Sequence, residues 1–381
     1  MKSNPVVCQF SEYFLDFRES LIENLLLVCN AIIISRSTNL SVMKDYLPQL
    51  LENEQTVSCS HYKRLIRSGG VPLFNISDSA NNKLIDCILG MIYKTLSQSV
   101  KYLILDGTQW KRGKKCVHLL TLCIVYHGIA IPIYWHQLNK KGGHSSEEDR
   151  QKLFTEACER YQLSGKILLA DREFIGEKWL AFLVSKKIDF IIRMSRTCYK
   201  KPISESLGFV YSKLEKMALK AKKTKKSILK QFQMKGNTYS VVIVKNDKDD
   251  PLEPLMYFIS TLQNKTEILN GYRIRWQIEI CFKHLKTNGF NLEDLNFRQD
   301  SKVCLMVALV VMAYVLSVQQ GLENKVEKKK IYKNKPSRLA VSYFRQGLSI
   351  IKAKVWTLRR FIGTLNDIFK NADQGKLLYV Q

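Results

Sequence analysis

Two aspartates each follow a short apolar run that predicts a buried β-strand. Asp106 comes directly after Tyr102-Leu-Ile-Leu105, and Asp171 comes directly after the run that begins at Lys166. A carboxylate at the end of a buried strand projects from a rigid core into a cleft, where it can hold a hard divalent cation. Acids at strand ends are common, so either aspartate alone indicates little. Their significance depends on a third element further along the chain.

The third element is a segment of helical periodicity from Glu267 to Lys286. At about 100° per residue, four of its side chains project within roughly 60° of one another. They are the phenol of Tyr272, the guanidinium of Arg275, the carboxylate of Glu279 and the ammonium of Lys286. A solvated polar stripe on an amphipathic helix is one interpretation. One acid among phosphate-seeking groups is instead typical of a metal-dependent phosphodiester site, in which Glu279 completes the metal coordination and the cations hold phosphates.

Other reactive side chains lack a comparable arrangement. The ten cysteines include no CxxC pair, which indicates reduced core thiols rather than a disulfide framework. Cys281 and His284 are three residues apart, but no second ligand pair completes a tetrahedral zinc site. No serine or cysteine has an evident His/Asp arrangement, which disfavours acyl transfer. The histidines of the strand-rich region have no ligand spacing and are interpreted as structural: His118, His127, His136 and His144.

The elements that position these groups alternate between strands and helices from residue 101 onward. Two β-rich runs, Val117–Tyr126 and Ile129–Gln137, meet across His127-Gly128 and predict a hairpin. Further strands are predicted at 188–193, 239–244 and 255–262, and helices at 146–161, 176–185 and 302–320. Such alternation predicts an α/β core with an interrupting insert. The apolar run 303–318 is shorter than the roughly 20 residues that span a bilayer, so we expect a buried core helix there.

The charge of the chain indicates a class of partner. Sixty Lys and Arg against 34 Asp and Glu give a net charge of +26. Such an excess favours a polyanionic partner, with nucleic acid as the first candidate and an anionic membrane surface as the second. Residues 1–100 are neutral (9 basic, 9 acidic), whereas residues 195–248 carry +11 (14 against 3) and residues 319–381 carry +10 (14 against 4). The lysine-rich stretch 213–235 either forms a solvated surface element or contacts phosphates.

The N-terminal hundred residues have a helical pattern. Two short helices are predicted at 41–51 and 57–66, separated by a tight joint. The second would present Lys63, Arg64 and Arg67, as in a helix-turn-helix that reads DNA. A plain helical hairpin is an equal alternative, because this region has no net positive charge to favour DNA.

Three motifs in order resemble the DDE transposases of the IS4 family. They are Asp106-Gly-Thr, then Ala170-Asp-Arg-Glu-Phe174, then the Tyr-(2)-Arg-(3)-Glu-(6)-Lys spacing of Tyr272, Arg275, Glu279 and Lys286. The resemblance implies an RNase H-like core with a β-rich insertion before the glutamate. It also implies that Asp106, Asp171 and Glu279 hold two Mg²⁺ or Mn²⁺ ions, and that Tyr272, Arg275 and Lys286 contact the transposon-end backbone.

The family also implies reactions and partners. Strand cleavage and strand transfer would act on double-stranded transposon ends and target DNA. The active form would be a homodimer in a synaptic complex. The protein would be bacterial, cytoplasmic and nucleoid-associated, without a membrane partner. Some members form a DNA hairpin with the help of an insertion-domain Trp. Here no Trp occurs between Asp189 and Tyr272, where Tyr257 or Phe258 could stack instead, and Trp276 is expected to pack.

The expected organisation has three parts. Residues 1–98 would form a helical, DNA-end-binding region, residues 99–320 the catalytic domain with its insertion at about 195–265, and residues 321–381 a basic helical region for DNA contact or dimerisation. The alternatives are an RNase H-like nuclease that cleaves without joining and a non-catalytic, domesticated DNA-binding protein. A membrane-surface protein ranks last, because the helix signature does not require one.

Overall fold

The chain forms two compact units in a computed structural model. One unit contains residues 1–98, 111–115 and 281–381, and the other contains residues 99–110 and 116–280. The structure describes residues 13–52, 73–96, 100–112, 115–138, 144–194, 211–224, 226–234, 237–246, 253–295, 297–324, 328–329, 338–339 and 341–373. The grouping differs from the expected three parts, because residues 281–320 belong with the N-terminal helices.

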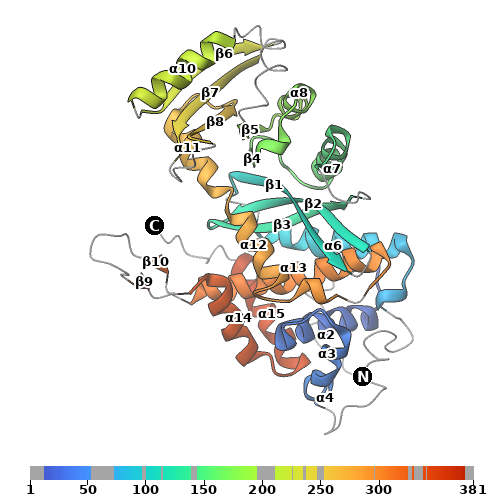
Figure 1. The fold of residues 1–381 in the computed structure, drawn as a ribbon. Helices are drawn as coiled ribbons and strands as arrows, with labels where there is room; N and C mark the ends of the chain where they lie inside the picture. Colours follow the sequence, from blue (N-terminus) through green and yellow to red (C-terminus); the bar gives the residue numbers. More distant parts are fainter. Residues whose placement is uncertain are drawn as a thin grey trace. The chain divides into compact units, whose positions relative to one another are not determined.

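An eight-stranded mixed sheet runs through the second unit in the order β3-β2-β1-β4-β5-β8-β7-β6 (Figure 1). Strands β1, β4 and β5 are parallel, while the pairs β2–β3, β5–β8, β8–β7 and β7–β6 are antiparallel. The bounds are β1 Tyr102–Arg112, β2 Lys115–Tyr126, β3 Ile129–Gln137, β4 Ile167–Ala170, β5 Asp189–Met194, β6 Ile228–Met234, β7 Asn237–Lys245 and β8 Leu255–Ser260. The predicted mixed α/β class is therefore confirmed.

The hairpin of β2 and β3 forms where the sequence predicts it. Its two turn residues, His127 (φ 47°) and Gly128 (φ 74°), both have left-handed backbone conformations. Two successive residues of this kind make a turn whose twist matches that of the flanking strands. Tyr126 consequently pairs with Ile129, and the register continues to Leu119 opposite Gln137, with one irregularity at Leu122/Cys123.

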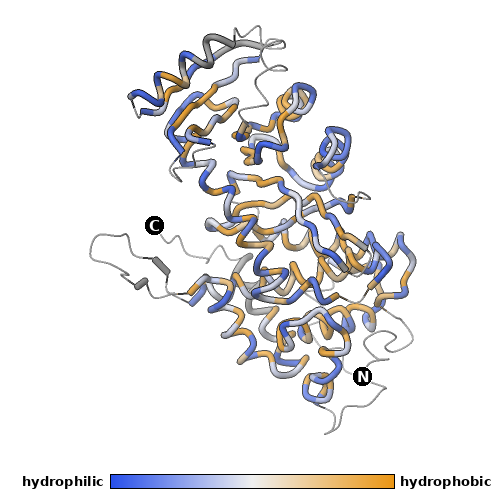
Figure 2. The backbone as a smooth tube through the Cα atoms, viewed as in Figure 1, coloured by the Kyte–Doolittle hydropathy of each residue, from blue (hydrophilic) through white to orange (hydrophobic). Residues whose placement is uncertain are grey.

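Helices cover the strands of this unit. Helix α7 (Glu147–Arg160) begins at a capping box in which the Ser146 hydroxyl and the Asp149 carboxylate each accept the other's backbone N–H. It packs on β3 and lies beside α8 (Glu177–Ser185), which packs on β5 (Figure 1). The hydropathy colouring of Figure 2 shows α7 as mostly hydrophilic and α8 as more hydrophobic. Each helix thus buries an apolar face against the sheet or its neighbour.

The chain between β5 and residue 264 adds three antiparallel strands to the edge of the same sheet. Helix α10 (Tyr211–Thr224) packs on β7, and the chain returns through β8 to the central strands. Strand β6 was not predicted, because it lies inside the lysine-rich stretch. In that stretch Lys220, Lys222, Lys223 and Lys230 are exposed, so it forms a solvated helix followed by an edge strand.

The helix predicted from Glu267 to Lys286 is broken in two. Helix α11 (Lys265–Ile274) ends before Arg275, and α12 (Gln277–Lys286) begins after Trp276. At the junction the backbone N–H groups of Ile278 and Glu279 bond to carbonyls three residues back, at Arg275 and Trp276. Bonds of this kind tighten the turn, so the side chains on the two helices do not follow a single helical wheel.

The first unit is a cluster of helices around α13 (Asp300–Glu323). Its other helices are α2 (Glu19–Ser35), α3 (Leu40–Met43), α4 (Leu47–Leu50), α6 (Asp78–Leu96), α14 (Tyr343–Lys354) and α15 (Leu358–Asp373). Among the described residues, 3₁₀ turns of this unit lie at Lys44–Tyr46, Leu73–Asn75 and Leu292–Asp294, that at Arg172–Phe174 belongs to the second unit, and two short strands are β9 (Lys328–Lys329) and β10 (Arg338–Leu339). Helix α13 packs against α14, α6 and α2, which confirms the predicted core helix.

Two segments of this unit qualify by length and composition as membrane spans. Helix α13 does so alone, although 83% of its most apolar window is buried. Helix α2 with residues 40–50 does so only as a pair bent by 88°. The predicted helix at 41–51 is instead α3 and α4 joined by a 3₁₀ turn. The expected helix at 57–66, with Lys63, Arg64 and Arg67, lies outside the described residues.

Candidate active site

The two strand-borne aspartates are brought together by the parallel register of β1 and β4. Leu105 pairs with Ala170 in the last step of that register, and Asp106 and Asp171 are the next residues on the two strands. Both carboxylates therefore lie at the same edge of the ladder. The expectation that Asp106 ends its strand is wrong, because β1 continues to Arg112. Only the pairing with β4 ends there.

Short hydrogen bonds to the backbone fix both carboxylates. Asp106 Oδ1 accepts the backbone N–H of Gly107 at 2.8 Å, and Asp171 Oδ1 accepts that of Arg172 at 2.7 Å. The hydroxyl of Tyr272 also donates to Asp171 Oδ1, at 3.3 Å. Each aspartate keeps its second oxygen for another partner.

Helix α11 reaches the aspartates because a glycine faces the sheet. A Cβ at Gly271 would lie 2.8 Å from Ile191 Cδ1 and 3.4 Å from Tyr102 Cε1, so a larger residue would force these side chains to shift. The next residue, Tyr272, packs against Phe258 of β8, with ring centroids 4.6 Å apart. This close approach places the Tyr272 hydroxyl on Asp171 and the helix junction beside Asp106.

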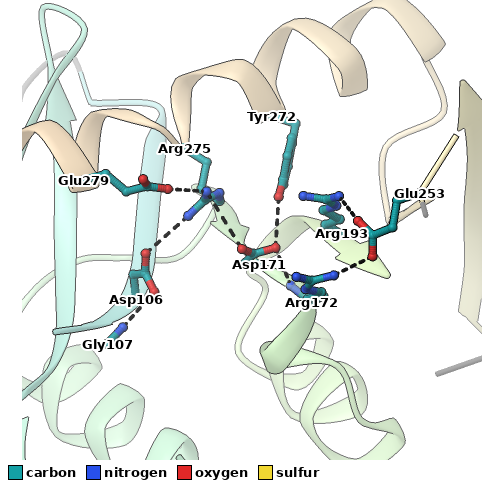
Figure 3. Close-up of polar contacts among 9 residues, drawn as sticks. All are labelled: Asp106, Gly107, Asp171, Arg172, Arg193, Glu253, Tyr272, Arg275 and Glu279. Atoms are coloured by element: carbon teal, nitrogen blue, oxygen red, sulfur yellow. Dashed lines mark hydrogen bonds and ion pairs between the residues drawn. The ribbon is translucent and has the colours of Figure 1, made fainter. Parts of the chain in front are cut away.

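Arg275, at the junction between α11 and α12, contacts all three of the predicted metal-binding acids (Figure 3). Its Nη1 lies 3.2 Å from Asp106 Oδ2. Its Nη2 lies 2.7 Å from Glu279 Oε1 and 3.9 Å from Asp171 Oδ2. The Arg275 side chain is only 10% exposed. One buried guanidinium thus gathers three carboxylates that are up to 173 residues apart in the sequence, from Asp106 to Glu279.

Burial and charge shift the pKa values within this cluster. Burial raises the pKa of Asp106 to about 7, although Arg275 and the Gly107 N–H oppose that shift. Burial by itself would lower the pKa of Arg275, but Tyr272, Asp171 and Asp106 raise it, so the guanidinium stays charged. Burial also raises the pKa of Tyr272, with a further contribution from Asp171. Its phenol therefore stays protonated and donates to Asp171.

The donor set fits a divalent metal ion in its chemistry. Three carboxylates supply the oxygen ligands that Mg²⁺ and Mn²⁺ prefer, and the buried Asp106 requires a cationic partner when it is ionised. In the present arrangement that partner is Arg275. Within the described part of the chain, no group of three His, Cys, Asp or Glu side chains is arranged to hold a metal ion directly. The acids are close to the guanidinium rather than to a common metal position.

Lys286 of the predicted helix face and Trp276 at the helix junction have surroundings that the sequence did not predict. Lys286 forms its ion pair with Glu293 (Nζ–Oε1 3.8 Å), whereas Tyr272, Arg275 and Glu279 join the aspartates. The break precedes both Glu279 and Lys286, which remain two turns apart on α12, so the predicted face is interrupted between Tyr272 on α11 and Glu279 on α12. Trp276, expected to pack, is 51% exposed at the junction.

The remaining candidates have local partners. His136 contacts Glu156 at 2.8 Å and His144 contacts Glu173 at 2.6 Å. His284 packs against the ring of Phe344 (centroids 4.4 Å apart), and burial lowers its pKa to about 4. His284 is consequently neutral near pH 7.

Sequence analysis missed a second charged group beside Asp171. Arg172 and Arg193 both form ion pairs with Glu253. Arg172 lies inside the Asp-Arg-Glu-Phe motif, and its position next to Asp171 could have marked it as a candidate site residue. Glu253 is 81 residues from Arg172, and no spacing rule connects the two.

The chain belongs to the family described as "Transposase DDE domain". The model of that family matches residues 100–316, which is more than half of the chain and includes Asp106, Asp171 and Glu279. Among solved structures, the chain is similar to the piggyBac transposase in a cryo-EM synaptic complex with hairpin DNA. The similarity has 11% identity and a TM-score of 0.47, and it covers 100% of this chain and 80% of that one. None of the curated protein sequences matches the chain.

Proposed function

We propose that this protein is a DNA transposase of the IS4 type, which cleaves the ends of an insertion sequence and joins them to target DNA. The observation that carries the proposal is the convergence of Asp106, Asp171 and Glu279 on one guanidinium. A fold that collects three distant carboxylates at one position prepares a site for cations, because the acids would otherwise repel one another. The spacing of Tyr272, Arg275, Glu279 and Lys286 supports the IS4 assignment.

We further propose that the catalytic core is RNase H-like. The strand order β3-β2-β1-β4-β5, with β1, β4 and β5 parallel, supports this assignment. The insertion supports it too, because α10 and β6–β8 lie between β5 and the helix that carries Glu279. In this proposal the insertion is a β-rich extension that interrupts the core after Met194.

Asp106, Asp171 and Glu279 would hold two divalent ions, Mg²⁺ or Mn²⁺. Ions bound there would activate an attacking oxygen and stabilise a leaving oxygen of a phosphodiester. The protein's own groups orient the site. Tyr272 and the Arg172 N–H hold one oxygen of Asp171, and the Gly107 N–H holds one oxygen of Asp106. Arg275 balances the charge of the carboxylates, and its guanidinium would bind a DNA phosphate.

The DNA partner is proposed from charge and from the family. Lys63, Arg64 and Arg67 would contact transposon ends, as would Tyr272, Arg275 and Lys286, and the basic region 321–381 would bind DNA or a second subunit. The proposed working form is a homodimer in a synaptic complex that acts on transposon ends and target DNA. The proposed location is the bacterial cytoplasm, at the nucleoid.

A cleavage and joining assay tests the proposal. The substrate is a DNA duplex with the genomic sequence that flanks the coding region, incubated with Mg²⁺ and a target plasmid. We expect cleaved and joined products from the native chain, and we expect Glu279→Gln to abolish both while binding the duplex as before. Glu267→Gln is the control, because Glu267, on α11, pairs with Lys101 and not with the cluster.

Each other outcome identifies a different protein. Cleavage without joined product would indicate the RNase H-like nuclease. Binding without cleavage by the native chain would indicate a non-catalytic, domesticated DNA-binding protein. Equal activity of the native chain and Glu279→Gln would remove the proposed site from the reaction.

A further inference from the structure

A second cationic group lies next to Asp171, and we call its two arginines, Arg172 and Arg193, the diarginine pair (Figure 3). Arg172 Nη1 donates to Glu253 Oε1 at 2.5 Å, and Arg193 Nη2 donates to Glu253 Oε2 at 2.6 Å. One carboxylate therefore holds two guanidinium groups. Because two positive charges face one negative charge, the group keeps a net charge of +1.

Each member is fixed by a different structural element. Arg172 opens the 3₁₀ turn that follows β4, and its backbone N–H is bonded to Asp171. Arg193 lies in β5, opposite Phe258 of β8. Glu253 precedes β8, on the chain that returns from the insertion. The diarginine pair is thus held in place by the central sheet and by the insertion together.

The diarginine pair retains donors for a ligand. Arg172 is half exposed and Arg193 is 21% exposed at the side chain. A guanidinium carries five N–H donors in a planar fork, and the Glu253 bonds above use one donor of each. Two adjacent forks that carry net positive charge match the shape and charge of a phosphate group.

A purely structural role explains this arrangement less well. Ion pairs that are partly exposed contribute little to stability, and a structural group would need a second acid to neutralise both arginines. The position of Arg172 is also informative, because it directly follows a carboxylate of the proposed catalytic site. A phosphate bound by Arg172 would therefore belong to the same DNA strand region as the reacting phosphodiester.

We propose that Arg172 and Arg193 form a binding site for one backbone phosphate of DNA, adjacent to the reacting phosphodiester. Glu253 is the positioning residue, which holds both guanidinium groups toward the ligand. This inference rests on the proposed function and deepens it, since it assigns a DNA contact to two arginines outside the Tyr-Arg-Glu-Lys signature. It also gives the insertion a role, because Glu253 ties its returning chain to Arg172 after β4 and to Arg193 in β5.

Salt-dependent DNA binding tests the inference. The full chain is titrated with a fluorescein-labelled duplex of the same flanking sequence in EDTA, so that binding is measured without cleavage. A plot of log K against log salt has a negative slope, and each lost phosphate contact reduces the magnitude of that slope by about 0.9. Arg172→Gln is expected to show this smaller magnitude. It should also weaken binding about eightfold at ~0.1 M salt, because a slope difference of about 0.9 over the tenfold range from ~1 M to ~0.1 M salt corresponds to a factor of about eight. Arg193→Gln is expected to behave alike.

The controls separate binding from folding. Arg160→Gln removes an exposed arginine of the same unit that donates to its own helix at Glu156 O, and it should bind DNA as the native chain does. Thermal melts of all variants detect loss of structure, and Arg172→Gln is the safer variant because its side chain is half exposed. A lower Tm with an unchanged salt slope would show that the group is structural and would overturn the inference.

The native chain provides the remaining comparison. If it cleaves the duplex with Mg²⁺ while Arg172→Gln and Arg193→Gln bind like the native chain, the proposed function stands and the phosphate site is wrong. If the native chain neither binds nor cleaves the duplex, both are wrong. A decrease of the slope in both variants, with Arg160→Gln unchanged, supports the phosphate site.

Discussion

Replacement of Arg275 by glutamine is the perturbation that most directly tests the carboxylate cluster. The substitution removes a buried cation that lies 2.7–3.9 Å from oxygens of three acids. Loss of one partner from a buried ion pair costs about 3–5 kcal/mol, and the lower end applies here because the three carboxylates left behind are 20–37% exposed and partly solvated. For a unit of this size, each kcal/mol lowers Tm by roughly 2–4 °C. We therefore expect Arg275→Gln to melt about 10 °C lower than the native chain at pH 8.

The effect must depend on pH with a definite sign. The folded-state pKa of Asp106 is about 7, above its ordinary value of 3.8. Its contribution to stability is therefore fully present below pH ~4 and is lost as the pH rises through ~7. Without Arg275, which lowers this pKa, the pKa rises further. The Tm difference between variant and native chain should consequently be smaller at pH 5, where Asp106 is neutral, than at pH 8.

Circular dichroism melts in EDTA at pH 5 and pH 8 measure this difference, with Arg160→Gln as the control. Mn²⁺ adds a second readout, because a ligand that binds only the folded state raises Tm. If the guanidinium balances the same carboxylates that would hold the ions, Mn²⁺ should raise the Tm of Arg275→Gln by more than that of the native chain. A pH-independent loss of Tm, or equal responses to Mn²⁺, would refute this account of the cluster.

Two further predictions concern the DNA contact and the helical unit. Lys286→Gln should weaken DNA binding and lower the salt slope by about one, as measured by anisotropy titration; an unchanged slope would indicate that Lys286 serves only its pair with Glu293. Gly347→Ala should lower Tm strongly, because a Cβ there would lie 1.7 Å from the Ser317 carbonyl oxygen where α14 meets α13. Gly90→Ala in α6, which meets nothing within 4 Å, should instead raise stability by up to about 1 kcal/mol; equal melting of the two variants would contradict this packing.

Local patterns predict the elements whose own residues determine them. The β2–β3 hairpin follows from two β-rich runs and a His-Gly turn, and α7 follows from its Ser146 cap and polar face. Strand β6 was not predicted, because its one lysine and two glutamines follow directly on the lysine-rich helix α10 and interrupt its apolar residues. The position of β6 in the sheet depends on its pairing with β7, a tertiary contact that the periodicity of apolar residues in the sequence does not reveal.

The acids of the site could be predicted, but their common partner could not. Asp106, Asp171 and Glu279 were selected by strand ends, helix periodicity and family motifs. The helical wheel placed Arg275 beside Glu279, as the structure does, but it assumed a continuous helix, whereas α11 ends before Arg275 and α12 begins after Trp276. No local signal marks the break, since Arg275-Trp276 contains neither Pro nor Gly. The tertiary packing of α11 on the sheet, through Gly271, accompanies the break.

The alignment of Leu105 with Ala170 has a consequence for how copies of the gene lose activity by mutation. Strand β4 has four residues, all of them buried and apolar, and its register with β1 brings Asp171 level with Asp106. A displacement of β4 by one residue would turn Asp171 to the opposite face of the sheet. Copies of the gene can therefore become inactive through changes at Ile167–Ala170 while every charged residue of the site is preserved.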